Sequence, residues 1–209
     1  MAYRGLVLDF AGVLATGIRE ATREWCTAQG LSAGAWRHAL DVDPAGRELY
    51  RALEAGRISQ AEWNRRTATL LGLTEADNLM GRAWAGVRRA GEIIALAQAA
   101  REAGMTVAML SNSFGLDPYD PYAHIGVWNL FDVAVISERE GIAKPDPAIY
   151  QLVLDRMALP GAECLFVDDQ AINLPPAAAL GITTVQASPD TTYVQQLTQM
   201  LGLPPAGTI

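Results

Sequence analysis

Four short stretches of this chain carry side chains that could bind a metal ion and a phosphate. Asp9 follows an apolar run near the start of the chain, and Asp168-Asp169 follow another apolar run nearer the C-terminus. Carboxylates from two such places form an all-oxygen site that suits Mg²⁺. Ser111-Asn112 and Lys144 add a hydroxyl, an amide and a cation, which are groups that hold phosphate oxygens. Together these residues predict phosphoryl-transfer chemistry, in which a metal ion and a lysine offset negative charge on the reacting oxygens.

These residues can act together only if the fold brings them to one place, and the order of predicted strands and helices does so. Apolar runs typical of buried strands occupy residues 6–8, 105–110, 133–136, 165–167 and 182–185. Helices are predicted over residues 92–101, from Asp146 as the cap through Met157, and over residues 175–180 and 191–201. A loop is predicted over residues 137–144. This alternation indicates an α/β fold with a Rossmann-like parallel sheet. Because parallel strands point the same way, the reactive residues at their carboxyl ends converge on one crevice.

Residues 16–89 differ from the rest of the chain because they show only helical periodicity, with no convincing strand. Ser59-Gln60-Ala61-Glu62 is a capping-box pattern that opens a helix closed by Gly72, and residues 74–77 repeat the signal. Ser32 is a further candidate helix cap. We therefore predict an all-helical cap of residues 16–89, inserted into an α/β core of residues 1–15 and 90–209.

Composition argues against several classes of partner. The 209 residues carry a net charge of -7, which argues against a nucleic-acid surface, since such a surface needs a basic patch. No apolar stretch approaches the roughly 20 residues of a membrane span, and no signal-peptide pattern precedes the first strand. The only two cysteines, Cys26 and Cys164, are far apart, which favours a reducing compartment. We expect a cytoplasmic protein with no nucleic-acid or membrane partner, and a loose tail over residues 204–209.

Four stretches also match, in order, the motifs of one enzyme superfamily. They are Asp9-Phe10-Ala11-Gly12-Val13-Leu14, Leu110-Ser111-Asn112-Ser113, Lys144-Pro145-Asp146-Pro147, and Val167-Asp168-Asp169 with Asn173, Ala177 and Gly181. On these residues the chain resembles the haloacid dehalogenase (HAD) superfamily, in the branch with a small helical cap inserted after the first motif. Each motif alone is weak, but four in order at predicted strand ends are specific, and the resemblance covers nearly the whole chain.

The resemblance implies a Mg²⁺-dependent hydrolase, in particular a phosphatase of a small phosphorylated metabolite. The residue that matches Asp9 is the nucleophile in such enzymes and forms an aspartyl-phosphate, since an aspartate is already ionised near neutral pH. Ser111, Asn112 and Lys144 would bind the phosphate, and Lys144 would also neutralise charge on Asp9. The implied metal ligands are Asp9, the backbone carbonyl of Ala11, Asp168 and Asp169.

Ala11 departs from the family pattern, and this leaves the function open among three alternatives. Family phosphatases usually carry a second aspartate at this position, which protonates the leaving group and then activates the hydrolytic water. Such help is typically worth about 10²–10⁴ in rate. The chain could be a phosphatase that uses good leaving groups or recruits an acid from the cap. It could instead be a C–P hydrolase similar to phosphonoacetaldehyde hydrolase, although residues 16–89 lack the cap lysine that this enzyme requires. The third alternative is a binding or regulatory protein that has lost turnover.

The segment after the second motif is a candidate for the entrance of the site. Residues 113–122 contain two Asp-Pro steps and two tyrosines, a composition typical of a loop. Asp117, Asp120 or His124 could supply the missing acid. The loop could equally contact a partner, including a second copy of the chain, so we expect a monomer or a homodimer.

Overall fold

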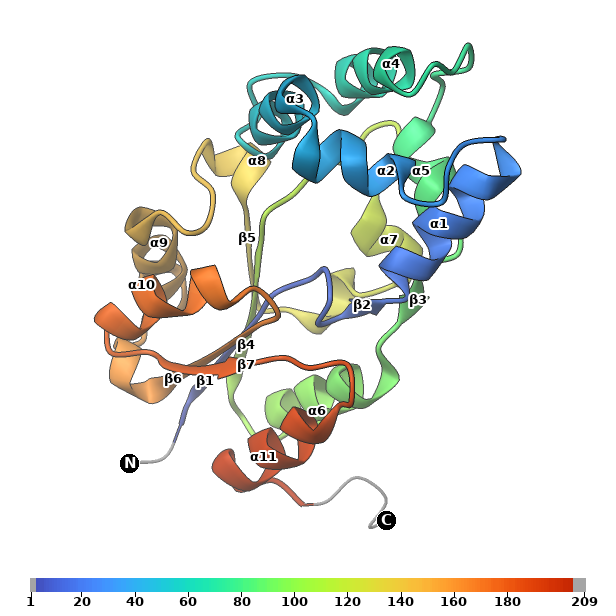
Figure 1. Cartoon of the computed structure of the whole chain (residues 1–209). Helices are drawn as coiled ribbons and strands as arrows, with labels where there is room; N and C mark the ends of the chain where they lie inside the picture. The colour runs from blue at the N-terminus through green and yellow to red at the C-terminus, as the bar shows by residue number, and fades with distance from the viewer. Residues whose placement is uncertain (1–2, 205–209) are drawn as a thin grey trace.

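Five parallel strands form the central sheet, with helices on both of its faces (Figure 1). The computed structural model describes residues 3–204, and the strands follow the order β5-β4-β1-β6-β7 across the sheet. Their bounds are β1 (Gly5–Leu8), β4 (Thr106–Ser111), β5 (Val133–Ile136), β6 (Cys164–Asp168) and β7 (Thr183–Gln186). The predicted α/β fold with a Rossmann-like parallel sheet is confirmed.

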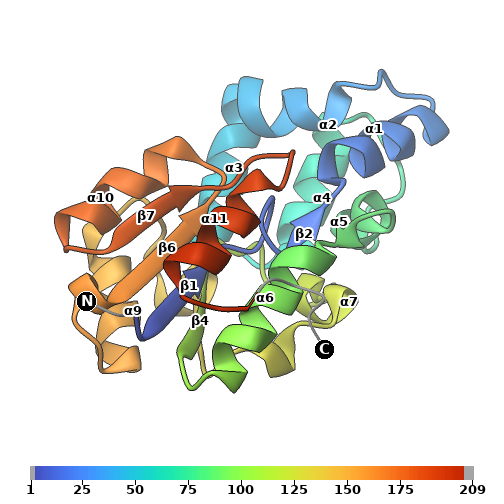
Figure 2. The same cartoon turned by 90° about the horizontal axis from the view of Figure 1, so that it is seen from below.

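Each face of the sheet buries its own hydrophobic cluster, because neighbouring side chains of a strand point to opposite faces. Leu6 and Leu8 of β1 belong to one cluster together with Ile93, whereas Val7 belongs to the other together with Ile149. Figure 2 shows the two helical layers, which consist of α6 (Gly91–Glu102) and α11 (Thr192–Met200) on one face, and of α9 (Pro147–Met157) and α10 (Leu174–Ala179) on the other. A strand covered on both faces must be apolar throughout, which explains the continuous apolar run of β1.

The central position of β1 decides where the candidate site forms. Leu8 pairs with Met109 of β4 on one side and with Val167 of β6 on the other. The backbone N–H of Asp9 continues this register and donates to the carbonyl of Val167 at 2.9 Å. Asp9 therefore lies between the carboxyl ends of β4 and β6, which carry Ser111 and Asp168.

The segment between β1 and α6 is mostly helical, but it begins and ends in a short antiparallel ribbon that we did not predict. Strand β2 (Ala15–Thr16) pairs with β3 (Arg88–Arg89), and Ala15 lies opposite Arg89. Strands this short leave no alternating pattern in the sequence, so only the contact between distant segments defines them. The helices between them are α1 (Ile18–Ala28), α2 (Ala35–Arg37), the π-helix η1 (His38–Val42), α3 (Pro44–Glu54), α4 (Gln60–Leu70) and α5 (Leu79–Trp84).

The predicted caps had mixed outcomes. Ser59 accepts a hydrogen bond from the N–H of Glu62 at 3.1 Å, and Asp146 caps α9 through the N–H of Ala148, as predicted. Ser32 does not cap α2, which begins after Gly34, and α5 begins after Asn78 rather than at residues 74–77. These two helices are short and gain their stability from tertiary packing, which a local capping signal does not report.

Two short helices lie beyond the carboxyl ends of β4 and β5. Helix α7 (Pro121–Ile125) follows the loop after β4, and α8 (Ser137–Glu140) forms directly after β5, where we predicted a loop over residues 137–144. The remaining short elements are the 3₁₀ turns η2 (Trp128–Leu130), η3 (Gly161–Glu163) and η4 (Ala171–Asn173). Within residues 3–204 no helix is long and apolar enough to cross a membrane. The tail predicted over residues 204–209 lies almost entirely outside the described residues.

We predict that α3 depends on the glycine at position 46. A Cβ atom there would collide with the carbonyl oxygen of Ala39, so Gly46→Ala should lower the free energy of unfolding by about 1–3 kcal/mol. Gly34→Ala is the matched control, because its Cβ would meet no atom within 4 Å and should change stability by less than about 0.5 kcal/mol. Urea unfolding of both variants tests this, and equal effects would contradict the close packing of α3 on η1.

Candidate active site

Lys144 is the centre of a buried cluster of charges at the carboxyl edge of the sheet. Its Nζ atom donates to Oδ1 of Asp9 at 2.7 Å and to Oδ2 of Asp168 at 2.6 Å. Lys144 is 5% exposed, Asp9 6% and Asp168 0%. Lys144 is also the only lysine in the sequence. A buried lysine between two carboxylates has a structural role, since two adjacent buried carboxylates without it would repel each other.

Asp168 is held in place by several further donors. Asn173 donates through Nδ2 to both oxygens of Asp168 at 3.0 Å, and the N–H of Gln170 donates to Oδ1 at 2.8 Å. The hydroxyl of Tyr150 in turn donates to the carbonyl of Asn173 at 2.8 Å. These bonds fix the carboxylate of Asp168 so that it can orient the ammonium group of Lys144.

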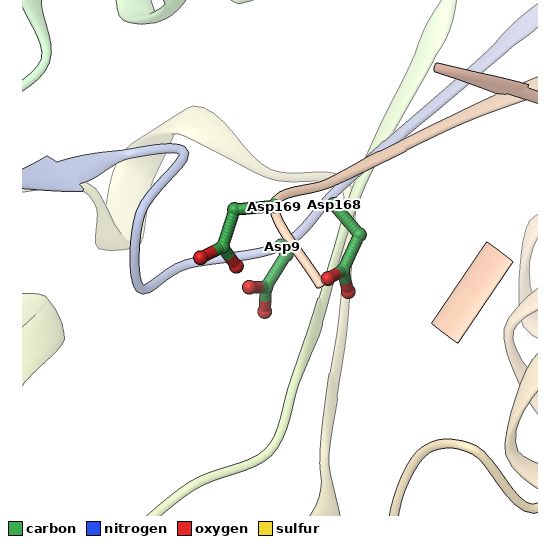
Figure 3. A group of neighbouring side chains, drawn as sticks. All are labelled: Asp9, Asp168 and Asp169. Atoms are coloured by element: carbon green, nitrogen blue, oxygen red, sulfur yellow. The ribbon is translucent and has the colours of Figure 1, made fainter. Parts of the chain in front are cut away.

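The three predicted acidic ligands lie together (Figure 3). Ligand oxygens of Asp9, Asp168 and Asp169 are all within 4.8 Å of one another. Gly12 makes room for this arrangement, because a Cβ atom at that position would approach Oδ2 of Asp169 to 2.7 Å. Gly12 also has a φ of 84°, which favours glycine. Carboxylate oxygens at this spacing fit Mg²⁺, because proteins bind this ion through the oxygens of acidic side chains and of water molecules.

Burial dominates the electrostatics of the acidic groups. It raises the pKa of the Asp9 carboxyl to about 7, the Lys144 ammonium opposes this rise, and the Asp168 carboxylate adds to it. Burial and the neighbouring Asp168 also raise the pKa of Asp169. For Lys144, burial alone lowers the pKa, but the carboxylates of Asp9 and Asp168 outweigh this effect and raise it. Lys144 is therefore positively charged at neutral pH.

Ser111 and Asn112, the two residues at the end of β4 that are expected to bind phosphate, have different surroundings. The hydroxyl of Ser111 is buried and accepts a hydrogen bond from the hydroxyl of Tyr122 at 3.0 Å, which orients it. The side chain of Asn112 instead binds the backbone of Lys144, accepting from its N–H at 2.8 Å and donating to its carbonyl at 3.0 Å. In this structure Asn112 therefore positions Lys144, because both of its polar atoms are used for that purpose.

The loop residues proposed as a replacement acid are engaged elsewhere or exposed. One oxygen of Asp120 caps α7 through the N–H groups of Tyr122 and Ala123, and the other accepts from the indole of Trp128 at 2.8 Å. The ring of His124 binds the carbonyl of Val87 at 3.1 Å. Asp117 is exposed in the loop before α7. The carboxylate of Asp120 therefore holds α7 and Trp128 in place, and its role as a replacement acid stays a prediction.

Sequence reasoning missed a buried contact between α4 and the loop after β4. The side chain of Gln60 is 2% exposed; its Nε2 donates to the carbonyls of Phe114 and Tyr119, both at 3.0 Å, and its Oε1 accepts from the N–H of Tyr119 at 3.0 Å. The sequence shows Gln60 only as the first residue of a capped helix. Its role appears when two segments that are far apart in the chain come together.

Comparison with known proteins identifies the family. A family model of haloacid dehalogenase-like hydrolases matches residues 3–181. The chain belongs to this family. Its five-stranded order and the four motif stretches at the carboxyl edge agree with the resemblance seen in the sequence.

Curated relatives match this chain over very different shares of their own length. Acyl-CoA dehydrogenase family member 10 of Mus musculus is 41% identical over 104 residues, which are 50% of this chain and 10% of that protein. Bifunctional epoxide hydrolase 2 of Sus scrofa is 37% identical over 73 residues, which are 13% of that protein. Sesquiterpene phosphatase astK of Aspergillus oryzae is 26% identical over 157 residues, which cover 74% of this chain and 80% of the relative. The chain thus spans only a small part of the first two relatives.

Solved structures match almost the entire chain. A HAD family enzyme of Bacteroides thetaiotaomicron, in complex with magnesium and inorganic phosphate, is 26% identical with a TM-score of 0.71 over 92% of this chain and 99% of that one. A HAD-like family hydrolase of Porphyromonas gingivalis is 21% identical with a TM-score of 0.74 over 96% and 98% of the two chains, and it supports the fold alone.

The raised pKa of Asp9 predicts how the stability of the metal-free protein depends on pH. The unfolded carboxyl ionises near 3.8 and the folded one near 7, so the folded state holds the extra proton between these values. The free energy of unfolding should therefore fall as the pH rises through this window. Asp9→Asn should remove part of this decrease in the free energy of unfolding. Urea unfolding in the presence of a chelator, at a series of pH values within this range, measures the decrease for both proteins. Identical pH dependence of the wild type and the variant would contradict the raised pKa.

Proposed function

We propose that this chain is a Mg²⁺-dependent phosphatase of small phosphorylated metabolites that acts through an aspartyl-phosphate on Asp9. The observation that carries the proposal is the position of Asp9. Its carboxylate ends the central strand, lies 2.7 Å from the only lysine, and shares a site with two further carboxylates. Family membership supports a hydrolase, and the geometry supports covalent catalysis by this aspartate.

In the proposed first step, a carboxylate oxygen of Asp9 attacks phosphorus and the bond to the ester oxygen breaks. Lys144 stays charged and offsets the negative charge that the phosphoryl oxygens bring into a buried site. The hydroxyl of Ser111, oriented by Tyr122, would contact a phosphoryl oxygen. Water then attacks the aspartyl-phosphate and releases inorganic phosphate, which regenerates Asp9.

Asp9, Asp168, Asp169 and the backbone carbonyl of Ala11 are the groups that would hold Mg²⁺. When bound, the ion would supply positive charge to the phosphoryl oxygens and favour the ionised form of the carboxylates. The magnesium and inorganic phosphate in the Bacteroides thetaiotaomicron enzyme support this assignment, and the phosphatase activity in the name of the Aspergillus oryzae relative supports the substrate class.

We also propose that residues 16–89 act as the cap that selects the substrate. The β2–β3 ribbon joins both ends of this segment to the core, and Gln60 fastens it to the loop after β4. A monomeric or homodimeric state and a cytoplasmic location stay predictions.

The second candidate function is that of a catalytically weakened, HAD-like binding or regulatory protein. Ala11 favours it, because a methyl group cannot transfer protons to the leaving group or from water. A C–P hydrolase has less support, because the only lysine in the sequence is Lys144, which belongs to the core and is bound by two carboxylates.

We predict that wild-type protein with Mg²⁺ releases phosphate from members of a panel of phosphate esters. Asp9→Asn should lower the rate by about 10⁴-fold or to background, since it removes the nucleophile, and a chelator should do the same. Asp155→Asn, on the exposed face of α9, is the matched control and should keep the wild-type rate. Phosphate release measured by a coupled assay distinguishes the candidates. Activity that appears only after Ala11→Asp would favour the weakened binding protein.

A further inference from the structure

An acidic residue that the family motifs do not include, Glu54, ends helix α3 beside the carboxyl edge of the sheet. Position 11 cannot supply a proton, and Asp120 is occupied by α7 and Trp128. The carboxyl end of α3, by contrast, is tied directly to the carboxyl edge of the sheet. The hydroxyl of Ser137, the residue after β5, donates to the carbonyl of Glu54 at 2.7 Å.

This contact is part of a chain of bonds that leads back to the phosphate-binding strand. The same Ser137 hydroxyl accepts from the N–H of Ser113 at 2.9 Å, two residues after Ser111. Close packing adds to it, because a Cβ atom on Gly56 would collide with the carbonyl oxygen of Glu138. The end of α3 is therefore held in a fixed position over the ends of β4 and β5.

Tyr50 and Glu54 are four residues apart in α3, so their side chains lie on one face of the helix. Both respond to the charges of the candidate site. Burial raises the pKa of Glu54 to about 7, while the positive charges of Lys144 and Arg51 oppose the rise. Burial also raises the pKa of Tyr50, and its further causes include Glu54, Tyr122 and Asp9. These charge effects agree with the bond from Ser137 to Glu54, which holds the carboxyl end of α3 next to the candidate site.

The carboxyl group of Glu54 is available for chemistry. Within residues 3–204 it takes part in no ion pair and accepts no side-chain hydrogen bond, and the residue is half-buried. A carboxyl group that is protonated in part of the population near neutral pH can donate a proton and later accept one.

We propose that Glu54 is the general acid and base of this site and replaces the aspartate that is missing at position 11. The proposal rests on the phosphatase function proposed above. As Asp9 attacks phosphorus and the P–O ester bond breaks, the Glu54 carboxyl gives its proton to the departing oxygen. The Glu54 carboxylate then takes a proton from the water whose oxygen attacks the aspartyl-phosphate. Inorganic phosphate leaves, and both Asp9 and Glu54 return to their starting forms.

The test compares Glu54→Gln with Glu138→Gln in the full chain with Mg²⁺. Glutamine keeps the size of the side chain and removes the acid, and Glu138 lies at the same edge of the sheet in α8. With an alkyl phosphate, whose alcohol needs a proton to leave, Glu54→Gln should lower kcat by about 10²-fold or more. With a nitrophenyl phosphate, whose phenolate leaves unaided, formation of the phosphoenzyme should change by less than about 10-fold. Glu138→Gln should keep wild-type rates with both esters.

Additional variants separate proton transfer from a structural role. Glu54→Asp keeps an acid and should lie between the wild type and Glu54→Gln, and thermal unfolding checks that each variant is folded. Adding Ala11→Asp to Glu54→Gln should restore alkyl phosphate turnover, because it places an acid at the family position. Ala11→Asp should raise the alkyl phosphate turnover of Glu54→Gln by a larger factor than it raises that of the wild type.

The outcomes also separate this proposal from the phosphatase function itself. If the wild type is active and Asp9→Asn is not, but Glu54→Gln matches the wild type, only the assignment of Glu54 is overturned. The same holds if Glu54→Gln slows phosphoenzyme formation equally with both esters, if Glu138→Gln slows it as much, or if Ala11→Asp gives no specific rescue. A wild type that is inactive on every ester overturns the phosphatase function and the role of Glu54 with it.

Discussion

The buried ammonium group of Lys144 between the carboxylates of Asp9 and Asp168 is the interaction on which the site depends. Taking three charged groups out of water is costly, and their mutual attraction offsets this cost only when further hydrogen bonds complete the geometry. Asn173 and Gln170 complete it for Asp168, and Asn112 fixes the backbone of Lys144. The cluster therefore explains why Asn112, Gln170 and Asn173 are each bound to Lys144 or to Asp168.

The fold supplies what this cluster needs. A central parallel strand covered on both faces brings Asp9 to the edge of the sheet with neighbouring strand ends on either side. Burial in this position raises the pKa of the Asp9 carboxyl, and the nearby lysine limits the rise. The ionisation of Asp9, the proposed nucleophile, is thus a balance between removal from water, which opposes it, and the charge of Lys144, which favours it. A bound divalent cation would favour the ionised form further.

Proton transfer is the part of the proposed reaction that the core cannot provide. A site with Ala11 has the proposed nucleophile, a cation and candidate metal ligands, but no group in its first motif that could carry a proton to the leaving oxygen. Assigning this task to Glu54 makes α3 part of the chemistry as well as of substrate selection. Turnover would then require the bond between Ser137 and the carbonyl of Glu54, which holds the end of that helix at the sheet edge.

The sequence by itself determined the five strands, the α/β class and the group of Asp9, Lys144, Asp168 and Asp169, because buried parallel strands leave continuous apolar runs and their ends carry the reactive residues. It also indicated the caps at Ser59 and Asp146, which are local. It did not reveal the β2–β3 ribbon, the use of Asp120 and Asn112 as structural groups, or the position of Gln60 and Glu54. Those features depend on contacts between residues far apart in the chain. Local patterns carry no information about such contacts, so only the tertiary structure decided them.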